Sequence, residues 1–204
     1  MDSVPFAFCD AVASTLFSLD GVNFGERCPW KSAFTDHQAN RIYLSLWVQF
    51  KDGNWFYVLR SSRPGHYFPV ELAELYKTRR KYVHIGLLAL QRRNFGIASS
   101  LDEIRRILEF ARPCVGLFAL LSLDRTDAPK ETIADLLSPF ASVPFQKIVI
   151  WDYEEAFEDV LRKQIELDTV QSFDVIQKSP AADELKAEFG SIQSLRAFNA
   201  LMLQ

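Results

Sequence analysis

Cysteine is scarce in this 204-residue chain, and its scarcity limits how the protein can be stabilised. The three cysteines, Cys9, Cys28 and Cys114, are odd in number and far apart, so the sequence does not predict a disulfide framework. A reducing compartment, the cytoplasm or the nucleus, is the expected location. No stretch approaches the roughly 20 apolar residues that cross a bilayer, and the first residues lack the basic start of a secretory signal. We therefore expect no membrane association.

Motifs for catalysis and metal binding are also missing. The three histidines, His37, His66 and His84, form no His-x-x-x-His pair and do not stand near a cysteine at metal-ligand spacing. Glycine-rich phosphate loops, nucleophile elbows and kinase or deaminase signatures are absent. We therefore expect no enzyme activity, no cofactor and no metal. An enzyme whose site is assembled from distant residues is an alternative, which a deep pocket with convergent polar groups would favour.

Neither basic nor acidic residues dominate the chain, but the two kinds of charge are unevenly distributed along it. The net charge is −3, with +4 over residues 1–112 and −7 over residues 113–204. The stretch 77–106 holds eight basic residues and two acidic ones. Nucleic-acid binding would need the basic groups on one surface, and the acidity of the whole chain argues against it. We expect solvated basic positions and no nucleic-acid binding, with an acidic protein partner as the second interpretation.

Large apolar side chains are plentiful. Hydrophobic residues make up 49% of the sequence, and they include 17 Phe, four Trp and six Tyr. A chain of this size and composition can form a sizeable core without metal ions or disulfide bonds. The length fits one large domain, or a small domain followed by a larger one.

The clearest structural signal is a β-hairpin. Two runs rich in β-branched and aromatic residues, 42–50 and 55–61, flank Asp52-Gly53, the favoured sequence for a two-residue turn. The turn predicts these opposed pairs: Phe50 and Trp55, Val48 and Tyr57, Leu46 and Leu59. The face that bears these residues should point toward the core. The opposite face is too apolar to be fully solvated, so we expect it to be covered.

From residue 70 onward, strand and helix patterns alternate. Strands are predicted at 82–90, 115–123, 146–151 and 170–176. Helices are predicted at 70–77, 101–111, 128–137 and 154–167, and two further helical stretches close the chain. Such alternation favours a mixed or mostly parallel sheet with crossover helices, so the predicted fold class is α+β to α/β. A leucine-rich-repeat-like solenoid is an alternative, because the last strand spacing falls within repeats of about 20–29 residues.

The first forty residues predict two short helices. Residues 5–19 repeat their apolar side chains at helical spacing on one face: Phe8, Val12, Leu16 and Leu19. Pro5 suits a first helical turn, where its missing N–H costs little. Residues 30–41 are expected to form the second helix, with the irregular segment 21–29 between the two.

This layout resembles a degenerate F-box, a motif that docks a protein onto a partner. Val4-Pro5 stands for the opening Leu-Pro of that motif, Val12 and Leu16 for its spaced aliphatic residues, Asp20 and Val22 for its turn, and residues 28–36 for its Trp segment. The chain departs from the motif at Ala7, where the family has an acidic residue, and at Pro29, which is expected to disturb a helix leading into Trp30. The whole layout is similar to proteins of the large nematode F-box and F-box-associated families.

The resemblance implies an F-box-like helical segment at 1–41 and a mixed α/β recognition domain at 42–204. It implies a non-enzymatic protein-interaction adaptor, a substrate-recognition subunit of a cullin-type ubiquitin ligase that binds an unknown protein substrate. A Skp-type adaptor protein would be contacted through these candidate residues: Val4, Pro5, Val12, Leu16 and Trp30. The alternative is a stand-alone α/β binding protein from a lineage-expanded family, with its N-terminal helix packed into its own core.

Overall fold

The computed structural model describes residues 4–15, 29–61, 69–92, 95–167, 169–177 and 179–202, with the backbone alone at Thr15, Leu117 and 192–202. Four of the candidate residues, Val4, Pro5, Val12 and Trp30, lie within these ranges. Several residues that the sequence singles out lie outside them: Leu16, Leu19, Asp20, Val22, Cys28 and His66.

The predicted hairpin is confirmed. Strands β1 (Ile42–Lys51) and β2 (Asn54–Ser61) pair antiparallel, with Phe50 opposite Trp55, Val48 opposite Tyr57 and Leu46 opposite Leu59. The turn holds Asp52 at φ 51° and Gly53 at φ 80°. Both residue types tolerate this left-handed backbone, which twists the strands in the direction that a hairpin needs.

The sheet is mixed and mostly parallel, as the alternating pattern predicts. Its seven strands follow the order β4-β2-β1-β3-β5-β6-β7. Strands β1, β3, β5, β6 and β7 lie next to one another in this order and are parallel. At one edge of the sheet, β2 pairs antiparallel with β1, and β4 pairs antiparallel with β2. The remaining strands are β3 (Val83–Gln91), β4 (Ile97–Ser99), β5 (Val115–Leu123), β6 (Lys147–Ile150) and β7 (Ser172–Val175). The fold class is therefore α+β to α/β.

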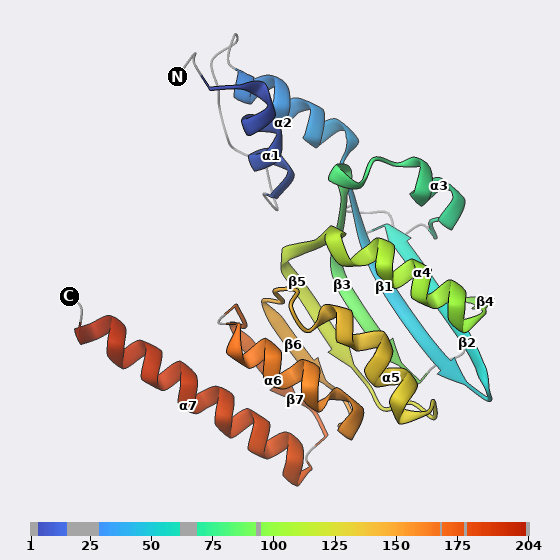
Figure 1. Ribbon diagram of the computed structural model, residues 1–204, viewed down its shortest axis with the longest axis vertical. Coiled ribbons are helices and arrows are strands. Elements are labelled where there is room, and N and C mark those ends of the chain that lie inside the picture. Colours follow the sequence, from blue (N-terminus) through green and yellow to red (C-terminus); the bar gives the residue numbers. More distant parts are fainter. Residues whose placement is uncertain are drawn as a thin grey trace.

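The connecting helices lie on one face of the sheet. They are α3 (Leu72–Lys77), α4 (Leu101–Ala111), α5 (Lys130–Leu137) and α6 (Glu158–Glu166), with short 3-10 turns η1 (Arg80–Tyr82), η2 (Arg112–Cys114), η3 (Ser138–Phe140) and η4 (Glu155–Phe157). Figure 1 shows α4, α5 and α6 in front of the strands. The parallel strands advance in one direction, and right-handed crossovers then place every connection on the same side. A leucine-rich-repeat-like solenoid would also add its parallel strands in one direction. The sheet differs from such a solenoid in the uneven lengths of its connections and in its two antiparallel strands.

The main core fills the space between these helices and the sheet. The hairpin face predicted to be inward is buried there, with Leu44 and Leu46 fully inaccessible. Large aromatic side chains complete the core under the helices, and Phe140, Phe145 and Phe157 are each 0% exposed. Ser100 caps the start of helix α4, because its hydroxyl accepts a hydrogen bond from the Glu103 amide at 3.1 Å.

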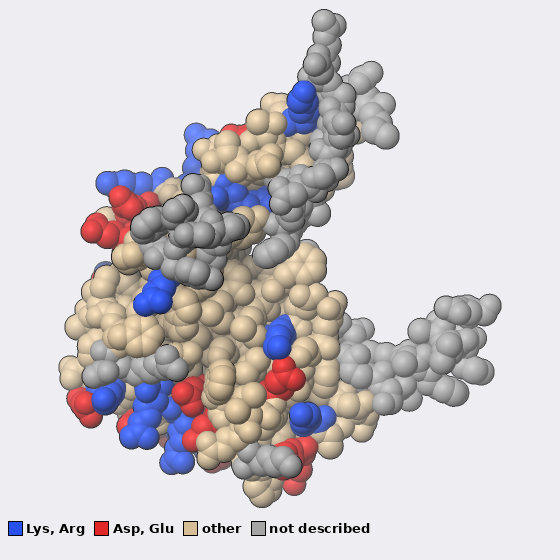
Figure 2. All heavy atoms as spheres, turned by 180° about the vertical axis from the view of Figure 1, so that it is seen from behind, with Lys and Arg blue, Asp and Glu red and all other residues tan. Residues whose placement is uncertain are grey.

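The opposite face of the sheet is covered by side chains, not by a helix of the described part of the chain. The Arg60 guanidinium lies over the Trp47 ring at 5.6 Å and over the Phe95 ring at 5.7 Å. Gly96 has φ 136°, and a Cβ built there would stand 2.5 Å from the Tyr57 carbonyl oxygen. Only glycine lets the chain approach β2 this closely. Figure 2, which views this side, shows mostly uncharged side chains across the middle of the body.

The C-terminal helix differs from the prediction. The sequence predicts two helical stretches, but α7 (Pro180–Met202) is one continuous helix that passes through Gly190. A single interior glycine costs about 1 kcal/mol relative to alanine, which weakens a helix without ending it. Its first part packs on β7, where the Phe189 ring stacks on Phe173 at 5.6 Å, and the remainder projects from the body (Figure 1). No helix among the described residues is both long and apolar enough to cross a membrane.

Two helices precede the sheet and stand at one end of the molecule (Figure 1). They are α1 (Phe6–Thr15) and α2 (Pro29–Asn40). Pro29 does not disturb the approach to Trp30, contrary to the expectation. It begins α2 itself, at a position where the absence of an N–H removes no helical hydrogen bond.

Candidate protein-interaction surface

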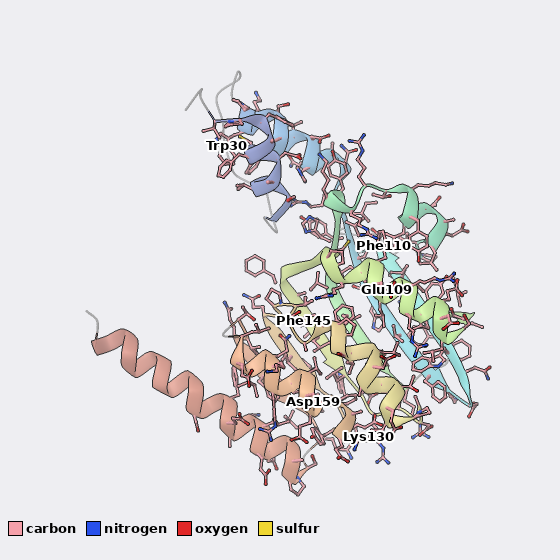
Figure 3. The ribbon with its side chains drawn as sticks, in the orientation of Figure 1. Trp30, Glu109, Phe110, Lys130, Phe145 and Asp159 are labelled. Carbon is pink, nitrogen blue, oxygen red and sulfur yellow. The ribbon has the colours of Figure 1, made fainter. Side chains whose placement is uncertain are left out.

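Helices α1 and α2 share a small core of their own. Cys9, Ala13 and Ala33 are 0% exposed and Phe34 is 8% exposed, and together they form a cluster distinct from the main core. Trp30 packs against this cluster from the side. Figure 3 shows Trp30 among the N-terminal helices, well away from the labelled Phe110 and Phe145 of the body. The N-terminal helices are therefore held together by contacts with each other.

The pairing of the two helices leaves one flank of α1 facing solvent. Cys9 and Ala13 use one edge of its apolar side for packing, and Pro5, Phe8 and Val12 occupy the other edge at i, i+3 and i+7. Phe8 is 55% exposed, and its ring meets the Trp30 ring edge-on at 5.8 Å. We name the four residues Pro5, Phe8, Val12 and Trp30 the docking stripe.

The structure places the predicted binding residues as follows. Pro5 is exposed, Val12 and Trp30 are half-buried, and all three belong to the docking stripe. Val4 is half-buried and packs against the small core, so its side chain contributes more to folding than to the surface. Leu16 lies outside the described residues.

Phe8 is the functional candidate that the choice of binding residues missed. It is the most exposed aromatic residue of the stripe, and it shares its helical face with Val12. The helical spacing of Phe8 and Val12 was therefore enough to indicate Phe8 as a candidate. What sequence could not supply was the direction in which that face points, because this depends on which edge of α1 packs against α2.

A polar network joins the N-terminal helices to the body. The Lys81 ammonium, from η1, donates to the Asp10 carboxylate of α1 at 2.9 and 3.2 Å. The fully buried His37 ring of α2 reaches the same carboxylate, with 3.0 Å between Nε2 and Oδ1. The Tyr82 hydroxyl donates to Asp36 of α2. These contacts bridge residues up to 71 positions apart and fix the two helices against the start of β3.

The charges of this network stabilise each other at neutral pH. The hydrogen bond from Lys81, and then that from His37, holds the pKa of Asp10 below its ordinary value. The Asp10 hydrogen bond in turn raises the pKa of Lys81. The carboxylate contributes stability that is lost only as the pH falls through its lowered pKa, and the ammonium contributes stability that is lost only as the pH rises through its raised pKa.

We expect the Asp10–Lys81 pair to show a coupling free energy of about 0.5–1 kcal/mol, because both side chains are only partly buried. The measurement is a double-mutant cycle of urea unfolding at pH 7 with Asp10→Asn, Lys81→Met and the double variant. The exposed pair Lys163–Glu166, at a similar distance of 3.0 Å, serves as the control and should couple more weakly. Coupling no larger than that of the control pair would contradict a joining role for this network.

The comparisons with known proteins leave the surface to be interpreted from its geometry. No protein-family model, curated protein or solved structure matches the chain. Within the described residues, no three His, Cys, Asp or Glu side chains are grouped so that they could hold a metal ion.

Proposed function

We propose that this chain is a non-enzymatic protein-interaction adaptor, with an F-box-like N-terminal segment at residues 1–41 that docks onto a Skp-type adaptor protein. In this role it is a substrate-recognition subunit of a cullin-type ubiquitin ligase. The observation that carries the proposal is the docking stripe on the flank of a small helical unit, where Pro5 and Phe8 are exposed and Val12 and Trp30 are half-buried. The identity of the partner comes from the resemblance to an F-box, in which Pro5, Val12 and Trp30 of the stripe take part.

The stripe has the chemistry of a helix that binds in a groove. Such helices present apolar anchors at i, i+3 and i+7, which is the spacing of Pro5, Phe8 and Val12. Aromatic residues, Trp above all, supply much of the binding energy in protein interfaces, and here Phe8 and Trp30 stand in edge-on contact. A contact between the rings that is present before binding would lower the entropic cost of forming the complex.

We propose further that the α/β body at residues 42–204 binds the protein substrate through the face of its sheet that faces away from α4, α5 and α6, at the β5–β7 end. Large apolar side chains are exposed along β5, β6 and β7, with Phe118 at 50%, Trp151 at 48% and Ile176 at 56%. The Trp151 indole N–H donates to the Ser122 hydroxyl at 3.1 Å, which holds the ring across the strands. A protein partner is the class of ligand that matches exposed apolar side chains on a broad surface.

Replacing Phe8 with Asp is expected to weaken binding of the Skp-type adaptor about 30-fold or more, since it removes a central aromatic anchor and places a charge in an apolar contact. The matched control is Phe118→Asp, which changes a phenylalanine of similar exposure on the body. Isothermal titration of each purified variant with the adaptor gives the dissociation constants. Thermal melting of the same samples shows whether each variant remains folded.

The two variants separate the proposal from its alternative. Loss of binding in Phe8→Asp alone, with cooperative melting retained, supports docking through the N-terminal helices. Equal binding by both variants and the wild type would overturn the role of the stripe. The absence of binding by a folded wild type would favour the stand-alone α/β binding protein.

A further inference from the structure

A pocket lies at the junction of the N-terminal helices and the body. It occupies about 250 Å³ and opens to solvent. Ser14 of α1 forms one side, η1 and the start of β3 form the second, and η2 and the start of β5 form the third. The pocket belongs neither to the docking stripe nor to the proposed substrate surface at the β5–β7 end of the sheet, so nothing in the proposed adaptor role uses it.

A buried histidine without a hydrogen-bond partner lines this pocket. His84 is 7% exposed, and its Nε2 has no partner among the residues that the structure describes. A Cβ built at Gly116, which also lines the pocket, would stand 3.9 Å from the His84 Nδ1. Burial, and then the nearby Arg41 and His37, lowers the pKa of His84 to about 4. The ring is therefore neutral near pH 7. Its Nε2 is enclosed by protein, so Nδ1, the nitrogen beside Gly116, is the one that can offer an N–H donor to a ligand in the pocket.

Two basic side chains share the lining. Lys81 is engaged with Asp10, as described above, but Arg80 forms no ion pair with a described carboxylate. The Arg80 guanidinium rests over the Phe110 ring at 5.1 Å, which restricts its motion and leaves its N–H groups for another acceptor. The donors at this pocket therefore come from η1 and β3, and they include Arg80, which has no counter-ion among the described residues.

The remaining wall is apolar. It consists of Val83, Pro113, Cys114 and Val115. Burial raises the pKa of the Cys114 thiol to about 11, so this side chain is uncharged and behaves as part of the apolar wall. A volume of about 250 Å³ exceeds the space that a bare phosphate or carboxylate fills and falls below the usual range of drug-sized sites.

From these observations we infer that the junction pocket binds a small organic anion, with its phosphate or carboxylate group on Arg80 and His84 and its short apolar part against Val83 and Val115. The donors match an oxyanion, and the apolar wall matches an attached carbon skeleton. Because α1 supplies one side of the pocket, the bound ligand would also contact the N-terminal helices and the body at once.

Substitution at Gly116 tests this site without removing any of its polar groups. Its backbone lies outside the left-handed region, so Gly116→Val adds a side chain toward His84 without strain. The expected result is at least about a tenfold weaker affinity, because the added side chain occupies ligand space. Gly86→Val is the matched control, since it makes the same change in β3 where nothing lies within 4 Å of the new Cβ. Arg80→Gln should weaken binding about tenfold by removing a charge-assisted hydrogen bond.

The probes are phenyl phosphate, benzoate, inorganic phosphate and phenol, titrated into the full chain by calorimetry, with the His84 ring followed by ¹H–¹⁵N NMR. The inference expects phenyl phosphate or benzoate to bind more tightly than inorganic phosphate and phenol and to shift the His84 ring signals. The stronger of the two identifies the anionic group. Binding that Gly116→Val and Arg80→Gln leave unchanged, or equal affinity for phenol, would overturn the inference. Equally tight binding of inorganic phosphate would overturn the role of the apolar wall. None of these titrations requires the proposed protein partner.

Discussion

Replacing Gln164 with leucine is expected to lower the free energy of unfolding by about 3 kcal/mol. The Gln164 side chain is 0% exposed. Its amide nitrogen donates to the carbonyl oxygens of Phe140, Ala141 and Val143 at 3.0, 3.1 and 2.7 Å, and its oxygen accepts from the Phe145 amide at 3.3 Å. Leucine would leave these backbone groups buried without that partner, although it has a similar size.

Urea unfolding of the purified variant measures this loss. Gln171→Leu is the control, because its side chain is exposed and makes one hydrogen bond, to Gln146. That change should alter the free energy of unfolding by no more than about 0.5 kcal/mol. If both variants were equally stable, Gln164 would not be the group that fixes the chain between η3 and β6.

Acidification from pH 7 to pH 4 is expected to remove about 3 kcal/mol of stability through His84 alone. Burial is the main cause that lowers the pKa of His84 from 6.5 to about 4 in the folded protein. Below pH 6.5 the unfolded chain therefore binds a proton that the folded chain does not. The stability is fully present above that pH and is lost progressively as the pH falls toward 4.

The comparison of wild type with His84→Gln isolates this contribution. The pKa of Glu154 is raised, chiefly by burial, so its protonation opposes the effect of His84 over part of the same range. The carboxylates of Asp10 and Asp36 have lowered pKa values and act at more acidic pH. The slope of the unfolding free energy against pH between 6.5 and 4.5 should be smaller in the variant. Identical slopes would show that folding does not lower the pKa of His84.

Local signals account for the parts of the fold that the sequence predicts. Asp52-Gly53 determines the hairpin and its register, because a two-residue turn allows one pairing of the flanking strands. The buried run at 115–123 and the alternation that follows it predict the parallel strands. The short strand β4 has no comparable signal, since it forms only where Gly96 allows close contact with β2.

The features that sequence could not supply depend on long-range contacts. The hydrogen bonds of Gln164 involve backbone partners, distant in sequence, that the local pattern does not reveal. The same holds at the candidate surface, where the outward direction of Phe8 follows from the packing of Cys9 and Ala13 against α2. Asp10 and Lys81 are 71 residues apart in the sequence, and no sequence motif predicts their contact.

The most direct test of the central claim is size-exclusion chromatography of the full-length wild-type chain mixed with a purified Skp-type adaptor. We expect the two proteins to elute together as a stoichiometric complex, and the folded Phe8→Asp variant to elute apart from the adaptor. Separate elution of the adaptor and a wild-type chain that melts cooperatively would contradict the proposed docking role of the N-terminal helices.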